Sequence, residues 1–145
     1  MVAIGPEKYN ELYDQIQNLN KLLAWGHARV IENILENVDC PNVLSDQFGD
    51  ESLIKKALMK KGQGITLYQR PRAEENIAVA AASILARDGF LAYMAQLSQD
   101  HNITLPKGAN PRVIQIGRKL VASSGKDVLR QVAKLHFKTT QSIIR

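Results

Sequence analysis

Carboxylates are the potentially reactive side chains with the clearest positions in this sequence. Asp46 falls at the end of a predicted strand, and Glu74 and Glu75 form one of the chain's adjacent acidic pairs. Carboxylates are the residue type that binds hard cations and moves protons. A strand-end acid can also cap the next turn, and two acids in the first turn of a helix suit the helix dipole. Local sequence leaves both interpretations open.

Cysteine, histidine and glycine give weaker signals. Cys40 is the single cysteine, so it cannot form an internal disulfide or a zinc cluster. It has no histidine or acid at motif spacing, which argues against nucleophilic catalysis. His27 lies among apolar helical neighbours, and we expect it and His136 to be structural. Gly62 and Gly64 lack the rest of either nucleotide-binding fingerprint.

The first half of the chain predicts a strand, helix, strand unit that positions Asp46. Helices are expected over Pro6–Tyr13 and from Asn18 to Val38, where apolar residues recur at helical spacing. Two strands are expected over Asn42–Phe48 and Ile65–Pro71, with a compact helix over Glu51–Met59 between them. Such a short helical crossover favours parallel pairing, and hence an α/β domain.

The second half predicts helices. A long helix is expected from Glu74 to about Asp100, with Tyr93 in the core and small residues that allow close approach to a sheet. A loop over Ile103–Pro111 follows. Two more helices are expected over Arg112–Ala122 and Lys126–His136, separated by a Ser-Ser-Gly turn.

Length and charge narrow the class of protein. The 145 residues fit one domain. The formal charge of +5 is the sum of −4 up to Met59 and +9 after it, a bias that favours a polyanionic partner but also fits ordinary solvated helices. The longest uncharged apolar run, Ile77–Ala86, is half of the roughly 20 residues that a membrane span needs. We therefore expect a soluble, cytoplasmic protein with no membrane partner.

Several segments together resemble the type 2 ribonucleases H, with most similarity to ribonuclease HIII. They occur in the family's order and cover nearly the whole chain. The segments are KYNELY (8–13), NLNKLLAWGHARVIE (18–32), LSDQF (44–48), RAEENIAVAAASILAR (72–87), LPKGA (105–109) and LHFKTT (135–140). The succession of a strand-end acid, an alanine-rich helix behind an acid, and a Lys-Gly loop is specific to that family.

This resemblance implies endonucleolytic hydrolysis of the RNA strand of RNA–DNA hybrids. In the family, four carboxylates hold two divalent ions, Mg²⁺ or Mn²⁺, which activate water and stabilise the departing oxygen. Asp46 matches the third of these acids. Glu74 matches the fourth, with Glu75 as the alternative if the helix is registered one position later. Asp50, in contrast, is expected to cap the next helix.

The chain departs from the family pattern at the first two acids. These form an Asp-Glu pair on the first strand of the family's catalytic domain, and no such glycine-rich motif occurs here. We therefore expect 1–145 to be the C-terminal portion of that domain, an incomplete ribonuclease H-like α/β fold without the three N-terminal antiparallel strands. With two of four ligands absent, we expect little or no activity from this chain alone. A separately encoded N-terminal fragment would fill the gap, but the chain could equally be a gene remnant.

Basic residues acquire a role within this resemblance, because hybrid binding is mostly contact with phosphates. Lys107, beside Gly108, is the first candidate, followed by Arg70, Arg72 and Arg112. Two other functions stay open: a non-catalytic nucleic-acid-binding module, or an assembly module that pairs through an exposed sheet edge.

Overall fold

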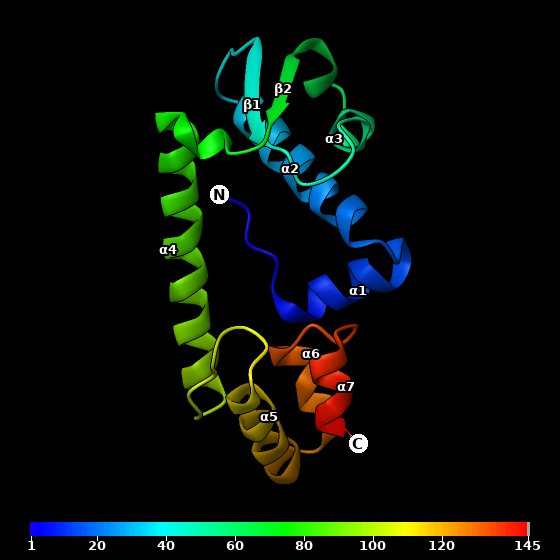
Figure 1. The fold of residues 1–145 in the computed structure, drawn as a ribbon, viewed down its shortest axis with the longest axis vertical. Helices are drawn as coiled ribbons and strands as arrows, with labels where there is room; N and C mark the ends of the chain where they lie inside the picture. Colours follow the sequence, from blue (N-terminus) through cyan, green and yellow to red (C-terminus); the bar gives the residue numbers. More distant parts are fainter. Residues whose placement is uncertain (145) are drawn as a thin grey trace. The chain divides into compact units, whose positions relative to one another are not determined.

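The computed structural model describes residues 1–144, which divide into two compact units. The first comprises residues 1–2 and 16–88; the second comprises residues 3–15 and the chain from Gly89 onward. The α-helices and strands, drawn in Figure 1, are α1 (Pro6–Ile16), α2 (Leu19–Leu35), β1 (Asn42–Asp46), α3 (Ser52–Ala57), β2 (Thr66–Arg70), α4 (Ile77–Asp100), α5 (Pro111–Ser124), α6 (Leu129–Val132) and α7 (Lys138–Ile144). Short 3₁₀ turns are η1 (Gly62–Gly64), η2 (Ala73–Glu75) and η3 (Lys126–Val128).

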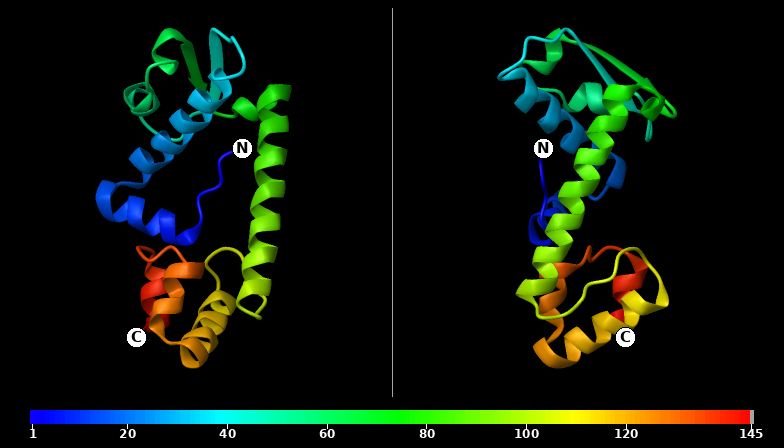
Figure 2. Two further views of the ribbon diagram at one scale, coloured as in Figure 1. Left: turned by 180° about the vertical axis from the view of Figure 1, so that it is seen from behind. Right: turned by 90° about the vertical axis from the view of Figure 1, so that its left-hand side faces the viewer.

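The first unit is built on two parallel strands, as the sequence predicts. β1 and β2 pair in register from Asn42 with Thr66 to Asp46 with Arg70. The crossover between them runs through α3 and η1, and α2 lies against one face of the pair (Figures 1 and 2). The two strand ends that carry Asp46 and Arg70 therefore lie side by side at one edge of the sheet.

The core of this unit forms where α2, α3 and β2 meet. Ala24, Ala28 and Ile31 lie at helical spacing on α2, and they pack with Ile54 and with Leu67 of β2. The small alanines let the helix approach the strands closely, and burial of these side chains provides the hydrophobic stabilisation. This packed core thus supports the strand pair that carries Asp46.

The second unit joins α1 to the C-terminal helices. Its buried residues include Tyr9 of α1, Leu120 of α5, Leu129 of α6 and Ile143 of α7. α5 and α7 pack closely because Gly117 has no side chain; a Cβ at this position would collide with Ile143.

Most of helix α4 is exposed. None of its residues is buried, and Ile77, Ile84 and Leu85 are 86%, 70% and 66% exposed. The small residues therefore do not pack on a sheet within the described chain, and the prediction that Tyr93 is in the core is wrong, since it is 42% exposed. By length and composition alone, α4 could cross a membrane. A helix that is covered by another layer of an α/β domain normally has the same apolar composition.

Two predicted helices differ from the structure in ways that matter for the site or the fold, beyond shifts of a few residues at the ends of the others. Glu74 and Glu75 are not in the first turn of α4 but in η2, because Arg72 is left-handed (φ 56°) and Asn76 is extended and caps α4 through its side chain. The region Lys126–His136 is not one helix: it consists of η3 and α6, followed by a turn that leads into the unpredicted α7.

Candidate metal-binding strand end

The candidate site begins where β1 and β2 end. Asp46 is the last residue of β1 and pairs in register with Arg70, and beyond it the N–H of Gln47 donates to the Arg70 carbonyl at 3.1 Å. The ladder therefore continues one residue past the acid. This pairing fixes the backbone on both sides of Asp46, while its side chain stays exposed.

The carboxylate of Asp46 binds the turn that carries the other predicted acids. Its Oδ1 accepts a hydrogen bond from the N–H of Ala73 at 3.2 Å. Ala73 is fully buried and directly precedes Glu74 and Glu75 in η2. Residues 27 or more positions apart in sequence are thus brought together by one side-chain to backbone bond.

The left-handed conformation of Arg72 makes this arrangement possible. With φ 56° and ψ 40°, Arg72 turns the chain sharply after β2 so that η2 folds back toward the end of β1. A non-glycine residue in this region carries a conformational cost of about 1 kcal/mol or more, which the surrounding contacts must offset. The sequence contains no glycine signal for this turn, so it could not be predicted.

The acids at this strand end suit a hard divalent cation in type but not in number. Asp46 and both glutamates of η2 are exposed and offer carboxylate oxygens, the donors that Mg²⁺ and Mn²⁺ prefer. Among residues 1–144, however, no three His, Cys, Asp or Glu residues are grouped closely enough to hold a metal ion. The choice between Glu74 and Glu75 stays a prediction, because one turn carries both.

Ser45 and His27, neither of which the sequence placed at this site, lie beside Asp46. Ser45 is buried, and its Oγ lies 3.3 Å from Nδ1 of His27 and donates to the Asp46 carbonyl at 3.0 Å. The His27 ring also stacks on Phe48, with 5.0 Å between ring centroids. Burial lowers the pKa of His27 from 6.5, and the charge of Asp46 partly opposes this shift. His27 is therefore packed, as predicted, but it packs on the strand that carries Asp46.

Asp50 has the capping role that the sequence predicts. Its Oδ1 accepts the N–H of Ser52 at 2.7 Å, at the first residue of α3. Hydrogen bonds from Ser52 lower the pKa of Asp50.

The predicted basic residues lie in different units. Arg70 and Arg72 are exposed and lie just before η2, in the same unit as Asp46. Lys107 and Arg112 are exposed in the second unit, where Gly108 adopts a positive φ of 88° beside Lys107 and Arg112 lies in the first turn of α5.

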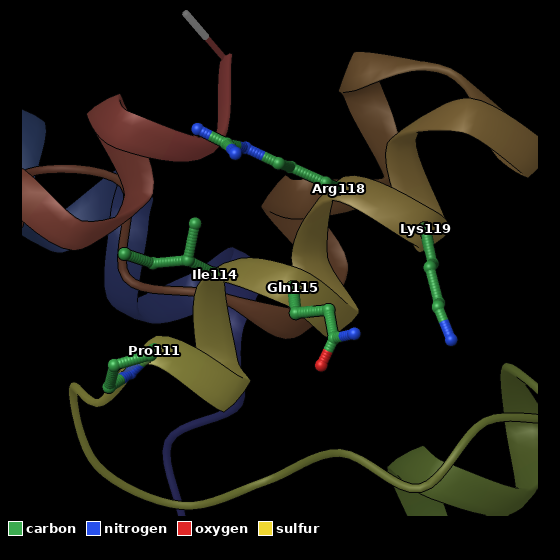
Figure 3. Close-up of a pocket in the computed structure, with 5 residues that line it drawn as sticks. All are labelled: Pro111, Ile114, Gln115, Arg118 and Lys119. Carbon is green, nitrogen blue, oxygen red and sulfur yellow. The ribbon is translucent and has the colours of Figure 1, made fainter.

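Two further basic side chains on α5 diverge (Figure 3). Arg118 extends toward α7, where its guanidinium donates to the Ser142 carbonyl at 3.2 Å, and Lys119 points away. Arg118 thus links two helices, whereas Lys119 is free to face solvent.

Comparison with known proteins identifies the family. The family model for ribonuclease HII matches residues 3–140. The ribonucleases HIII of Protochlamydia amoebophila and Chlamydia pneumoniae are 45% and 47% identical to this chain. Each match covers 99% of this chain, but only 48% and 49% of the respective relative.

Solved structures agree with this relationship. Bst-RNase HIII in complex with Mn²⁺ superimposes with a TM-score of 0.89 at 28% identity, over 99% of this chain and 48% of that one. The RNase H3 of Aquifex aeolicus superimposes with a TM-score of 0.68, over 92% of this chain and 47% of that one. The chain spans about half the length of the relatives that it matches. Its α/β architecture is thus part of a ribonuclease H fold, and the chain belongs to the type 2 ribonuclease H family.

Proposed function

We propose that this chain provides half of the metal site of a ribonuclease HIII-like endonuclease that hydrolyses the RNA strand of RNA–DNA hybrids. The observation that carries the proposal is the hydrogen bond from the Ala73 N–H to Asp46 Oδ1. It places the acid-bearing turn η2 against the strand-end acid, where the two could share a cation. Relatives named ribonuclease HIII, one of them solved with Mn²⁺, make Mg²⁺ or Mn²⁺ the expected ion.

The residues present would divide the work as follows. Asp46 would offer Oδ2 and the free lone pair of Oδ1, and Glu74, or alternatively Glu75, would offer a second carboxylate from η2. Divalent ions held there would activate water and neutralise charge on the scissile phosphate. The hydrogen bonds of Asp46 to η2 and of Gln47 to Arg70 support this assignment, because they hold Asp46 and the backbone of η2 close together and such chemistry requires well-positioned ligands.

We further propose that activity needs a second polypeptide segment that supplies the remaining carboxylates and covers the exposed parts of the fold. Within residues 1–144, each strand of the two-stranded sheet has one unpaired edge, and α4 exposes Ile77, Ile84 and Leu85. Unpaired edges and a continuous apolar helix face are features that another layer normally covers. A separate N-terminal fragment is one way to provide it.

Basic side chains would hold the hybrid through its phosphates. Arg70, which pairs with Asp46, and Arg72, which precedes η2, are the candidates near the scissile bond. Lys107 and Arg112 are the candidates in the second unit. Phosphate contacts of this kind make binding fall steeply with salt concentration.

Reconstitution tests the proposal. The chain is mixed with the part of the Protochlamydia amoebophila relative that it does not match, and cleavage of a labelled hybrid is followed with Mg²⁺ and with Mn²⁺. We expect cleavage of the RNA strand only in the mixture, and a loss of at least about 100-fold with Asp46→Asn or with Glu74→Gln. Glu75→Gln serves as the matched control and would exchange roles with Glu74→Gln if Glu75 is the ligand.

The alternative function is binding of nucleic acid without catalysis. It is favoured by the net charge of +9 after Met59. Hybrid binding in the mixture that stays intact with Asp46→Asn, but without cleavage under any metal condition, would replace the proposed function by this one.

A further inference from the structure

We infer that His27 is a positioning residue for Asp46, acting through Ser45 and Phe48. The inference rests on the proposed ligand role of Asp46, but the contacts that carry it do not depend on a metal. His27 reaches the strand on both sides of the acid. It meets the residue before Asp46 through a hydrogen bond and the residue two positions after it through ring stacking.

The direction of the hydrogen bonds follows from the number of protons. The Ser45 hydroxyl has one proton, which it donates to the Asp46 carbonyl at 3.0 Å. For the 3.3 Å contact with His27 also to be a hydrogen bond, Nδ1 must carry the proton and donate to Oγ. The result is a two-step chain from the His27 ring through the Ser45 hydroxyl to the peptide of Asp46. It orients the Asp46 peptide without touching the carboxylate.

Helix α2, from which this chain of hydrogen bonds starts, is well packed. His27 lies on α2 next to Ala28, which is 1% exposed, and Ala24 and Ile31 hold the same helix in the core. Ser45 is 6% exposed, so water competes little for its hydroxyl. A buried bond to a well-packed helix is the kind of support that keeps a ligand in place. Without it, the end of β1 would depend on the strand ladder and on the bond from Ala73 to the Asp46 side chain.

Backbone hydrogen exchange of the chain itself tests this inference without metal. The reporting amides are those of Gln47 and Ala73, which donate to the Arg70 carbonyl and to Asp46 Oδ1. The reference amides are those of Met59 and Gly62, in the same unit, which donate to the buried Glu32. His27→Phe keeps an aromatic ring for Phe48 but removes the donor.

We expect His27→Phe and Ser45→Ala to speed exchange at the two reporting amides by roughly tenfold and to leave the reference amides unchanged. His27→Asn, whose side-chain N–H lies close to the position of Nδ1, should restore much of the protection. Unchanged exchange at the reporting amides, an equal loss at all four amides, or no rescue by His27→Asn would each overturn the inference.

Cleavage assays distinguish a failure of the proposed function from a failure of this inference. If Asp46→Asn leaves metal-dependent cleavage by the reconstituted protein unchanged, Asp46 is not a ligand, whatever the exchange rates show. If Asp46→Asn abolishes cleavage but His27→Phe changes neither cleavage nor exchange, the ligand role stands and the positioning role of His27 is wrong.

Discussion

The carboxylate of Glu32, deep in the first unit, accepts the N–H of Gly62 at 2.8 Å. The same side chain also accepts the N–H groups of Met59, at 2.7 Å, and Lys61, at 3.2 Å. Glu32 is only 7% exposed, so one side chain of α2 satisfies three backbone donors of the crossover between β1 and β2. The crossover sets where β2 begins, and therefore the register that places Arg70 opposite Asp46.

Removing this carboxylate should destabilise the first unit. Glu32→Ala leaves three backbone donors without their acceptor, and we expect the free energy of unfolding to fall by about 2–4 kcal/mol. Glu32→Gln, which keeps one acceptor oxygen, should cost less. Urea unfolding followed by the fluorescence of Trp25, on the same helix, measures both. Glu36→Ala, exposed at the end of α2, is the control and should change stability little.

The close approach of the crossover to Glu32 predicts an effect of Gly62→Ala. A Cβ at Gly62 would lie 2.6 Å from Oε1 of Glu32 and 2.7 Å from Cδ2 of Leu58, so the buried groups must move. We expect Gly62→Ala to lower the free energy of unfolding by about 1–3 kcal/mol. Gly64→Ala is a matched control, since nothing lies within 4 Å of its Cβ position. Equal stability of the two variants would show that the crossover is not packed as described.

Much of the first unit could be predicted from the sequence, because its signals are local. Alternating apolar residues predict both strands, and a short crossover predicts their parallel pairing. Asn18 marks the start of α2, where its side chain accepts the N–H of Lys21. The turn η2 could not be predicted, since it depends on a left-handed arginine and on the bond from Ala73 to Asp46, which joins residues distant in sequence.

The C-terminal region was harder to predict for a similar reason. Helical spacing continues past α6, but the backbone leaves the helix where the Ala133 carbonyl accepts the side chain of Asn10 and the Lys134 carbonyl accepts the hydroxyl of Thr140. The contact with Asn10 is long-range and the one with Thr140 is local, and both compete with helix propensity. His27 and Ser45 were likewise missed as neighbours of the candidate site, since only pairing of α2 with β1 brings them together.

Asn10 should be essential for the second unit. Its amide donates to the carbonyls of Arg130 and Ala133, and its Oδ1 accepts the N–H of Leu135, all from a side chain that is 2% exposed. We expect Asn10→Ala to destabilise this unit by about 2–4 kcal/mol. Asn10→Asp, of the same shape but without donors, should also be destabilising. Exchange of the Leu135 amide measures the effect; protection as in the parent chain would contradict it.

The second unit should lose stability in mild acid. His136 stacks on Tyr13 at 3.8 Å between ring centroids and lies beside Tyr9, Lys134 and Phe137. Burial, and then the charge of Lys134, lowers the pKa of His136 below 6.5. The unfolded chain therefore takes up the proton first, so the contribution of His136 is complete above pH 6.5 and is lost as the pH falls toward the folded pKa.

The pH effect can be isolated with one variant. His136→Phe keeps an aromatic ring in the stack but does not titrate, so protection of the Leu135 amide should fall less between pH 7 and pH 5 than in the parent chain. His27, whose pKa burial also lowers, lies in the first unit and should affect the Trp25 signal instead. An identical pH dependence of Leu135 protection in parent and variant would refute the role of His136.

The exposed face of α4 predicts how the chain behaves without its proposed complement. Ile84 and Leu85 are 70% and 66% exposed in the middle of the helix, and exposed apolar surface of this kind promotes association. We expect Ile84→Glu combined with Leu85→Lys to reduce concentration-dependent association in sedimentation, with little change in the unfolding midpoint, because neither side chain is packed in the described chain. The same variant should fail to support cleavage in the reconstituted mixture, since charges would then face the covering segment. Gln63→Glu, at an exposed polar position, is the control. Full cleavage by the α4 variant would mean that this face is not where the complement binds.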